Sequence, residues 1–281
     1  MLTVAVALLP AMATGQCNQV VTPIIQSTFL GQNRQIWVSL PEKYDSRKSY
    51  PVLYVLDAET HFKLIQGLEN SLSNSKKIPE HIVVGIPHVN KEKERIKDLT
   101  FSLSKVNPYG DKILPPFFNR QNCGGGYRFL DFLNKELIPF VDSAYATTGF
   151  NILCGHSLSG YFASYMLSLP HSFQAVQLYD PSVWYAEGEA TKQLQNGISK
   201  NKLSVFLAYQ QNPDFHFQQV KSFGETLDKT PIDNYKREVF TDENHHSIFL
   251  IAFIHGMEWL YNDYKRKNFK LKKERPYSIP Q

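Results

Sequence analysis

Four mostly apolar runs of strand length lie along the chain. A run without polar alternation is typical of a strand that is covered on both faces, as in a parallel sheet. Residues 35–40 alternate polar and apolar side chains instead, which predicts a half-buried strand, and residues 235–240 predict the last strand. The four apolar runs are residues 51–56, 81–86, 175–179 and 203–209.

Helical patterns separate these predicted strands. Residues 127–141 carry apolar side chains three and four positions apart, which predicts an amphipathic helix. Shorter patterns predict helices over residues 62–72, 217–227 and 247–261. Strands that alternate with helices indicate an α/β protein, with a mostly parallel central sheet and helices on both faces. A polar loop with proline and glycine is predicted over residues 88–126, and loops of that length are usually functional.

A serine lies between one predicted strand and the helix that follows it. Residues 151–160 read Asn-Ile-Leu-Cys-Gly-His-Ser-Leu-Ser-Gly, and residues 158–167 predict the helix. A tight strand–turn–helix with small residues two before and two after a serine is a nucleophile elbow, which exposes the serine hydroxyl above the sheet. The small residues here are Gly155 and Ser159, and Ser159 stands where glycine is usual. The alternative is that Ser157 lies in an ordinary turn.

A serine hydroxyl is a weak nucleophile and needs a neighbouring base. The last predicted strand leads into a loop with two histidines, and we expect His245 to be the base, with His246 as the alternative. The acid that orients the imidazole is predicted to be Asp214, in the turn after the fourth apolar run. Asp180, at the end of the third run, is the other candidate. Asp214 could equally be a turn residue, which leaves a serine–histidine pair without an acid open.

Acyl transfer also needs hydrogen-bond donors for the oxyanion that develops on the substrate. One donor is predicted to be the backbone N–H of Leu158, directly after the serine. The second is expected from the loop after residues 51–56, either from Ala58 or from Glu59. Only the backbone of Glu59 would serve in this role.

Composition indicates an ordinary globular protein. The 281 residues are 42% hydrophobic and 20% charged, with a net charge of +4. Residues 264–281 hold seven lysines and arginines against Glu274 alone, so the rest of the chain is slightly acidic. We expect this C-terminal tail to be a solvated end. No basic stripe crosses residues 16–263, which we take as one domain, so nucleic acid is not an expected partner.

The N-terminal residues are apolar from Leu2 to Met12, and small residues follow. This pattern predicts a secretory signal peptide over residues 1–15, and therefore a periplasmic or secreted protein; a buried strand in a cytoplasmic protein is the alternative. The run is too short to be a transmembrane segment. Three cysteines cannot all pair within one chain. Cys154 is expected to be a buried small side chain, and in an oxidising compartment Cys17 could pair with Cys123.

Several segments in this order resemble the putative-esterase family of α/β-hydrolases, which contains enterochelin and salmochelin esterases, S-formylglutathione hydrolases and mycolyltransferases. The resemblance spans roughly residues 35–262 and looks closest to the siderophore-esterase-like branch. The matching segments are YPVLYVLDAE, IPEHIVVGI, RIKDLT, GGGYRFLDFLNKELIPFVDSAY, CGHSLSG, DPSVWY and ENHHS.

The resemblance implies an α/β-hydrolase fold with Ser157 as nucleophile and His245 as base. It implies the N–H groups of Leu158 and Glu59 as oxyanion donors, and a substrate pocket lined by Arg95 and Trp184. Three residues depart from the family pattern: Ala58 and Ser159 replace glycines, and Asn212 stands where a carboxylate is expected.

The function implied is that of a serine esterase that hydrolyses a small carboxylic ester through an acyl-enzyme, without a metal or another cofactor. Two alternatives stay open. One is an acyltransferase on the same scaffold. The other is a non-catalytic binding protein with a degenerate triad, which the departure at Asn212 motivates. The sequence does not indicate an oligomeric state.

Overall fold

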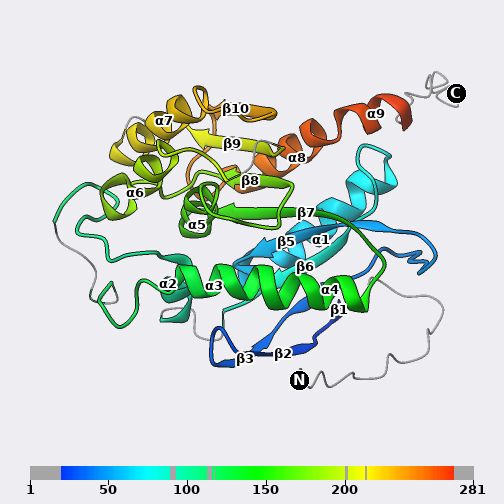
Figure 1. Cartoon of the computed structure of the whole chain (residues 1–281). Helices are drawn as coiled ribbons and strands as arrows, with labels where there is room; N and C mark the ends of the chain where they lie inside the picture. The colour runs from blue at the N-terminus through cyan, green and yellow to red at the C-terminus, as the bar shows by residue number, and fades with distance from the viewer. Residues whose placement is uncertain are drawn as a thin grey trace, which may run out of the picture.

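The apolar runs form the middle of an eight-stranded sheet in the computed structural model, which describes residues 20–88, 93–112, 116, 118–199, 202–212 and 214–268 (Figure 1). The strands are β1 (Val20–Val21), β4 (Trp37–Ser39), β5 (Tyr50–Leu56), β6 (Ile82–Ile86), β7 (Thr147–His156), β8 (Ala175–Tyr179), β9 (Ser204–Gln210) and β10 (Asn234–Phe240). Their spatial order is β1-β4-β6-β5-β7-β8-β9-β10. Neighbours from β6 to β10 are parallel, whereas β4 pairs antiparallel with β6 and β1 antiparallel with β4.

Side chains of the central strands enter two separate hydrophobic layers, one on each face of the sheet. In β5, Leu53 and Val55 belong to one layer, whereas Tyr54 and Leu56 belong to the other. This alternation is the period of two that a strand imposes on its side chains. Because both faces are covered, the strand is apolar at every position from Val52 to Leu56, as the sequence predicted.

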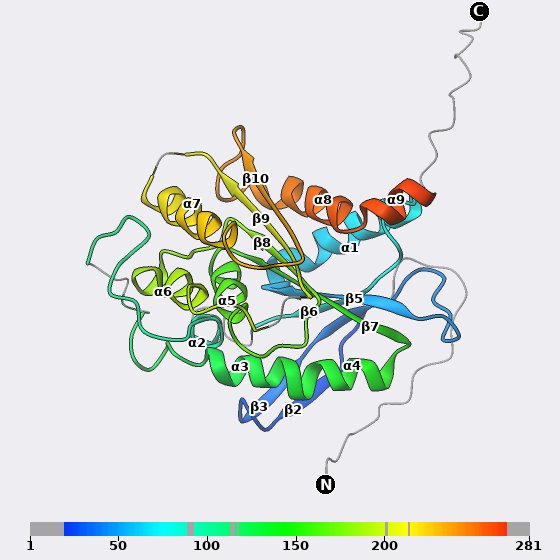
Figure 2. The ribbon, with the colours of Figure 1, turned by 45° about the horizontal axis from the view of Figure 1, so that its top comes forward.

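Helices cover both faces (Figure 2). On one face lie α1 (Ala58–Asn74) and α8 (Ile248–Leu260). On the other lie α2 (Glu94–Leu99), α3 (Gly126–Phe132), the π-helix η1 (Leu133–Leu137), α4 (Ile138–Ala144), α5 (Leu158–Met166), α6 (Tyr185–Leu194) and α7 (Phe215–Leu227). A two-stranded hairpin of β2 (Ile24–Ser27) and β3 (Gln32–Gln35) lies beside this layer, and α9 (Asn262–Asn268) follows α8. The prediction of an α/β fold with a mostly parallel sheet is confirmed.

The observed elements differ from the sequence predictions in some places and match them in others. Helix α1 begins four residues earlier than predicted, and α2 lies inside the segment that was predicted as one long loop. The helix predicted over residues 127–141 is one continuous run of α3, η1 and α4. The proposed signal peptide over residues 1–15 and most of the basic tail lie outside the described residues. Within the described ranges, no helix combines the length and the apolar character that crossing a bilayer requires.

The carboxyl ends of the parallel strands meet at one edge of the sheet. Asp57, Ser157 and Asp180 come directly after β5, β7 and β8, which are consecutive in the sheet. The loops after β9 and β10 reach the same edge. Ligand sites of open α/β sheets lie at this edge, so the fold gathers the polar residues where a site is expected.

Candidate active site

Ser157 occupies a strained turn between β7 and α5. Its backbone has φ 58° and ψ −120°, a conformation that side-chain-bearing residues rarely adopt. The turn requires close backbone approach, because a Cβ on Gly155 would overlap the carbonyl oxygen of Ser159, and one on Gly160 would lie 2.9 Å from Pro181. These contacts produce the tight strand–turn–helix that the sequence predicted at residues 151–160.

Ser159, which replaces the usual glycine, stabilises this turn with its side chain. Its hydroxyl donates to the carbonyl oxygen of His156 at 2.8 Å and accepts the backbone N–H of His156 at 3.0 Å. The side chain is fully buried. A serine therefore fits the position because its hydroxyl closes the turn that it occupies.

His245 lies over the serine, from the loop after β10. Its Nε2 is 2.9 Å from Ser157 Oγ, and its Nδ1 is 2.6 Å from Asp180 Oδ2. His246, the alternative base, lines the same cavity, but no contact joins its ring to the serine in the described structure. A hydrogen-bonded chain thus runs from Asp180 through His245 to Ser157.

The structure corrects the prediction that Asp214 partners the imidazole. Asp214 is exposed and its carboxylate accepts the backbone N–H of Phe217 at 2.7 Å, which makes it the N-cap of α7. Asp180, the other candidate, is fully buried and faces His245. Residues 211, 212 and 214, which follow β9, are exposed, whereas Asp180 is tied to the sheet by the bond from its N–H to Ala208 O at 2.7 Å.

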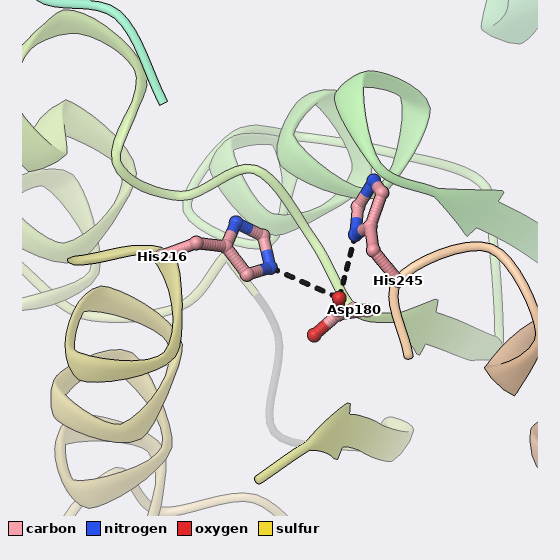
Figure 3. A group of neighbouring side chains, drawn as sticks. All are labelled: Asp180, His216 and His245. Carbon is pink, nitrogen blue, oxygen red and sulfur yellow. Dashed lines mark hydrogen bonds and ion pairs between the residues drawn. The ribbon is translucent and has the colours of Figure 1, made fainter. Parts of the chain in front are cut away.

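Asp180 is charged in spite of its burial. Burial alone would raise the pKa of its carboxyl group, but contacts with His216 and His245 hold that pKa below its usual value. Figure 3 shows both imidazoles directed at the carboxylate of Asp180 from two different elements. His216 belongs to the first turn of α7 and was not predicted as a site residue. Its position shortly after β9, at the same edge of the sheet, could have indicated it.

His156, directly before the serine, is a second histidine of the site that was not predicted from the sequence. Burial and the nearby charge of His245 lower its pKa to about 3, so its ring is neutral at ordinary pH. Its Nε2 lies 2.7 Å from the backbone carbonyl oxygen of His245, so this nitrogen carries the proton and donates it. The strand that bears the serine therefore supports the loop that bears His245.

Two helix starts offer backbone N–H groups near the serine. Leu158 is the first residue of α5 and lines the cavity, and Ala58 is the first residue of α1. The first N–H groups of a helix have no partner within the helix and favour negative charge. Glu59 follows Ala58, and its carboxylate accepts the backbone N–H of His88 at 3.4 Å. The donor role of the Leu158 N–H, and the choice between Ala58 and Glu59 for the second donor, stay predictions.

A cavity of about 630 Å³ opens beside Ser157 and His245. Arg95 lines it, as predicted, together with Ile96, Phe118 and His61. Trp184 was also expected there. The structure instead places Trp184 in the core, 5% exposed, and outside the cavity lining.

The guanidinium group of Arg95 is held by a buried ionic network. It donates to Asp57 through two bonds, of 2.6 and 2.8 Å. His88 lies between Asp57 and Asp98, with Nε2 3.3 Å from Asp57 and Nδ1 3.1 Å from Asp98, and Asp98 also binds Arg34 at 2.7 Å. Although burial favours the neutral acid, Arg95 and His88 hold the pKa of Asp57 well below its usual value. The positive charge that Arg95 brings to the cavity lining is thus balanced by the carboxylate of Asp57.

Asp180, His216 and His245 are residue types that bind metals, and their ligand atoms lie within 4.8 Å of one another. A tetrahedral metal ion would separate such ligands by about 3.3 Å, with each about 2.0 Å from the ion. Both imidazole nitrogens instead face one carboxylate oxygen, at 2.6 and 3.1 Å. These are the distances of N–H···O contacts, so the geometry fits hydrogen bonding better than metal coordination.

The parallel sheet, the elbow and the histidine loop define an α/β-hydrolase. The family model described as Putative esterase matches residues 27–216, and the chain belongs to this family. The resemblance drawn from the sequence is therefore confirmed.

Comparison with individual proteins gives the same fold. The structure of an IroE-like serine hydrolase from Shewanella oneidensis is similar, with a TM-score of 0.77 and 29% identity over 87% of this chain and 81% of that one. The siderophore hydrolase EstB from Aspergillus nidulans gives a TM-score of 0.67 and 17% identity over 90% and 98% of the two chains. The uncharacterized protein YbbA of Bacillus subtilis (strain 168) is 23% identical over 246 residues, which cover 82% of this chain and 93% of that protein.

Proposed function

We propose that this protein is a serine esterase that hydrolyses a small carboxylic ester through an acyl-enzyme. The observation that carries the proposal is the chain of contacts in which His245 reaches Ser157 Oγ with one ring nitrogen and Asp180 with the other. An imidazole in this position can take the hydroxyl proton, and the buried carboxylate fixes its tautomer and stabilises the imidazolium.

The reaction proceeds in two halves. Ser157 Oγ attacks the ester carbonyl carbon while His245 Nε2 takes the hydroxyl proton, and the alcohol leaves with that proton. Water then attacks the acyl carbonyl, His245 takes a proton from the water, and Ser157 recovers it as the acid is released. The N–H of Leu158, with that of Ala58 or Glu59, stabilises the oxyanion in both halves.

The contact between Asp180 and His245 supports catalysis over a non-catalytic binding protein. That alternative rested on the missing carboxylate at Asn212. A carboxylate from the end of β8 lies beside the imidazole instead, so the exposed turn around Asn212 need not supply one.

For the substrate, we propose siderophore esters as the first class to assay. The support is the likeness to the IroE-like serine hydrolase and to the siderophore hydrolase EstB. Feruloyl and short acyl esters extend the same screen, since ferulic acid esterases have the same fold. Product analysis with a competing alcohol separates hydrolysis from acyl transfer.

The test of the mechanism is Ser157→Ala with p-nitrophenyl acetate as substrate. We expect turnover to fall by about 10⁴-fold or more, because the nucleophile acts as a unit with its base. A fluorophosphonate probe should label the wild type and leave the variant unlabelled. Ser143→Ala, at the exposed end of α4, is the matched control and should react and turn over like the wild type. Unchanged turnover in Ser157→Ala would refute the proposal.

A further inference from the structure

We propose that His216 is a positioning residue for Asp180: its Nε2–H donates to Asp180 Oδ2 and fixes the carboxylate that faces His245. This inference rests on the proposed esterase function. It assigns His216 a role in the reaction without contact with the reacting atoms.

The placement of His216 carries the inference. His216 Nε2 lies 3.1 Å from Asp180 Oδ2, the same oxygen that His245 Nδ1 approaches at 2.6 Å (Figure 3). The residue is 8% exposed, and among the described residues Nε2 makes no hydrogen bond of good geometry; its approach to Asp180 Oδ2 is an ion-pair contact. A buried ring N–H without an acceptor is costly, and in this proposal the carboxylate of Asp180 supplies the acceptor.

Asp180 needs this second donor. Its side chain is fully buried, and among the described residues its other oxygen, Oδ1, accepts only the backbone N–H of Gln210, at a long 3.4 Å. A buried carboxylate is stabilised in its charged form by the hydrogen bonds that it accepts. Without His216, the carboxylate would be held by His245 at Oδ2 and by this long contact at Oδ1, so its orientation would be less well fixed.

Other titratable groups face the same imidazole and stay unchanged in this comparison. The rings of His156 and His246 lie 4.8 and 5.4 Å from that of His245, centroid to centroid, and His61 lies 5.5 Å from His156. Asp214 on α7 is engaged with Phe217 N–H of its own helix. The difference between wild type and a His216 variant therefore reports on the contact with Asp180.

The experiment compares three variants across pH 5–9, with kcat and KM for p-nitrophenyl acetate. His216→Phe keeps the ring volume and removes the donor, whereas His216→Gln retains an N–H donor near the position of Nε2. His255→Phe is the matched control, because His255 lies on α8 and pairs with Glu238 away from the cavity. Thermal melts establish that each variant is folded before its kinetics are compared.

We expect His216→Phe to lower kcat by about 10- to 100-fold, the usual cost of one hydrogen bond to a charged group, with little change in KM. His216→Gln should recover most of kcat, and His255→Phe should match the wild type.

Two results would overturn the inference. Wild-type kinetics in His216→Phe would show that Asp180 needs no second donor, and a loss of kcat in His216→Gln as large as that in His216→Phe would make His216 a packing residue. Failure of the esterase proposal is a separate outcome: the wild type would then show no more turnover than Ser157→Ala.

Discussion

The turns after β8 and β9 are neighbours at the same edge of the sheet, and each carries an aspartate. Asp180 follows β8 directly, is fully buried and receives contacts from His245 and His216. Asp214 lies four residues beyond the end of β9, is exposed and caps α7 through the N–H of Phe217. One carboxylate contacts an imidazole, and the other caps the start of a helix.

The difference shows that the surroundings of a carboxylate decide its task. Asp180 is held by the sheet, since its N–H donates to Ala208 O, and its side chain therefore points along the strand ends toward the base loop. Asp214 lies past the sheet, where the nearest donors are the free N–H groups that begin α7. The two turns are also connected, because the helix that Asp214 caps carries His216, which contacts Asp180.

The largest effect should follow from Asp180→Asn. We expect kcat for p-nitrophenyl acetate to fall by about 10³- to 10⁴-fold, because an amide cannot hold the imidazole in the tautomer that accepts the serine proton. Asp214→Asn is the matched control and should retain wild-type kcat. Equal losses in the two variants, or a larger loss in Asp214→Asn, would reverse the assignment of the acid.

A smaller effect should appear in the acid dependence of stability. The pKa of Asp180 is lower in the folded than in the unfolded chain, so the stability that its charge contributes is complete above the unfolded pKa of about 4 and is lost as pH falls below it. The free energy of unfolding of the wild type should therefore fall more steeply than that of Asp180→Asn between pH 5 and pH 3. Urea titrations at several pH values measure both slopes. Parallel slopes would contradict the lowered pKa.

The smallest effect should follow from Asp214→Ala. Loss of the N-cap of α7 should lower the free energy of unfolding by about 1 kcal/mol and the Tm by about 2–4 °C. Activity should stay within about threefold of the wild type, because His216 is held by the rest of α7 as well as by its contact with Asp180. Calorimetry and steady-state kinetics on the same preparation test both statements. A collapse of activity with intact stability would place Asp214 in the reaction after all.

Much of the fold could be predicted because its signals are local. The buried strands are continuous apolar runs, and the elbow at Ser157 is marked by the small residues around it. His245 could be chosen because one short loop after the last strand offers two adjacent histidines. Each of these predictions depends only on neighbouring positions in the chain.

The acid and its second donor could not be predicted in this way. Which aspartate meets His245 depends on the order of β8, β9 and β10 in the sheet and on how far each turn extends, and the sequence states neither directly. His216 gains its role only because α7 begins at Phe215 and directs the next side chain inward. Trp184 was misplaced for the same reason, since the direction of a side chain at a helix start is a tertiary property.

The bond between His156 and the carbonyl oxygen of His245 has a mechanical consequence. It joins the residue before the nucleophile to the backbone of the base, across 89 positions of sequence, and it uses a ring that stays uncharged at ordinary pH. The bond attaches the loop of His245 to the strand that bears Ser157, so we expect the spacing of the two side chains to change little when a ligand enters the cavity. We expect substrates of different size to be accommodated instead by other lining residues, such as Arg95 and Ile96 of α2.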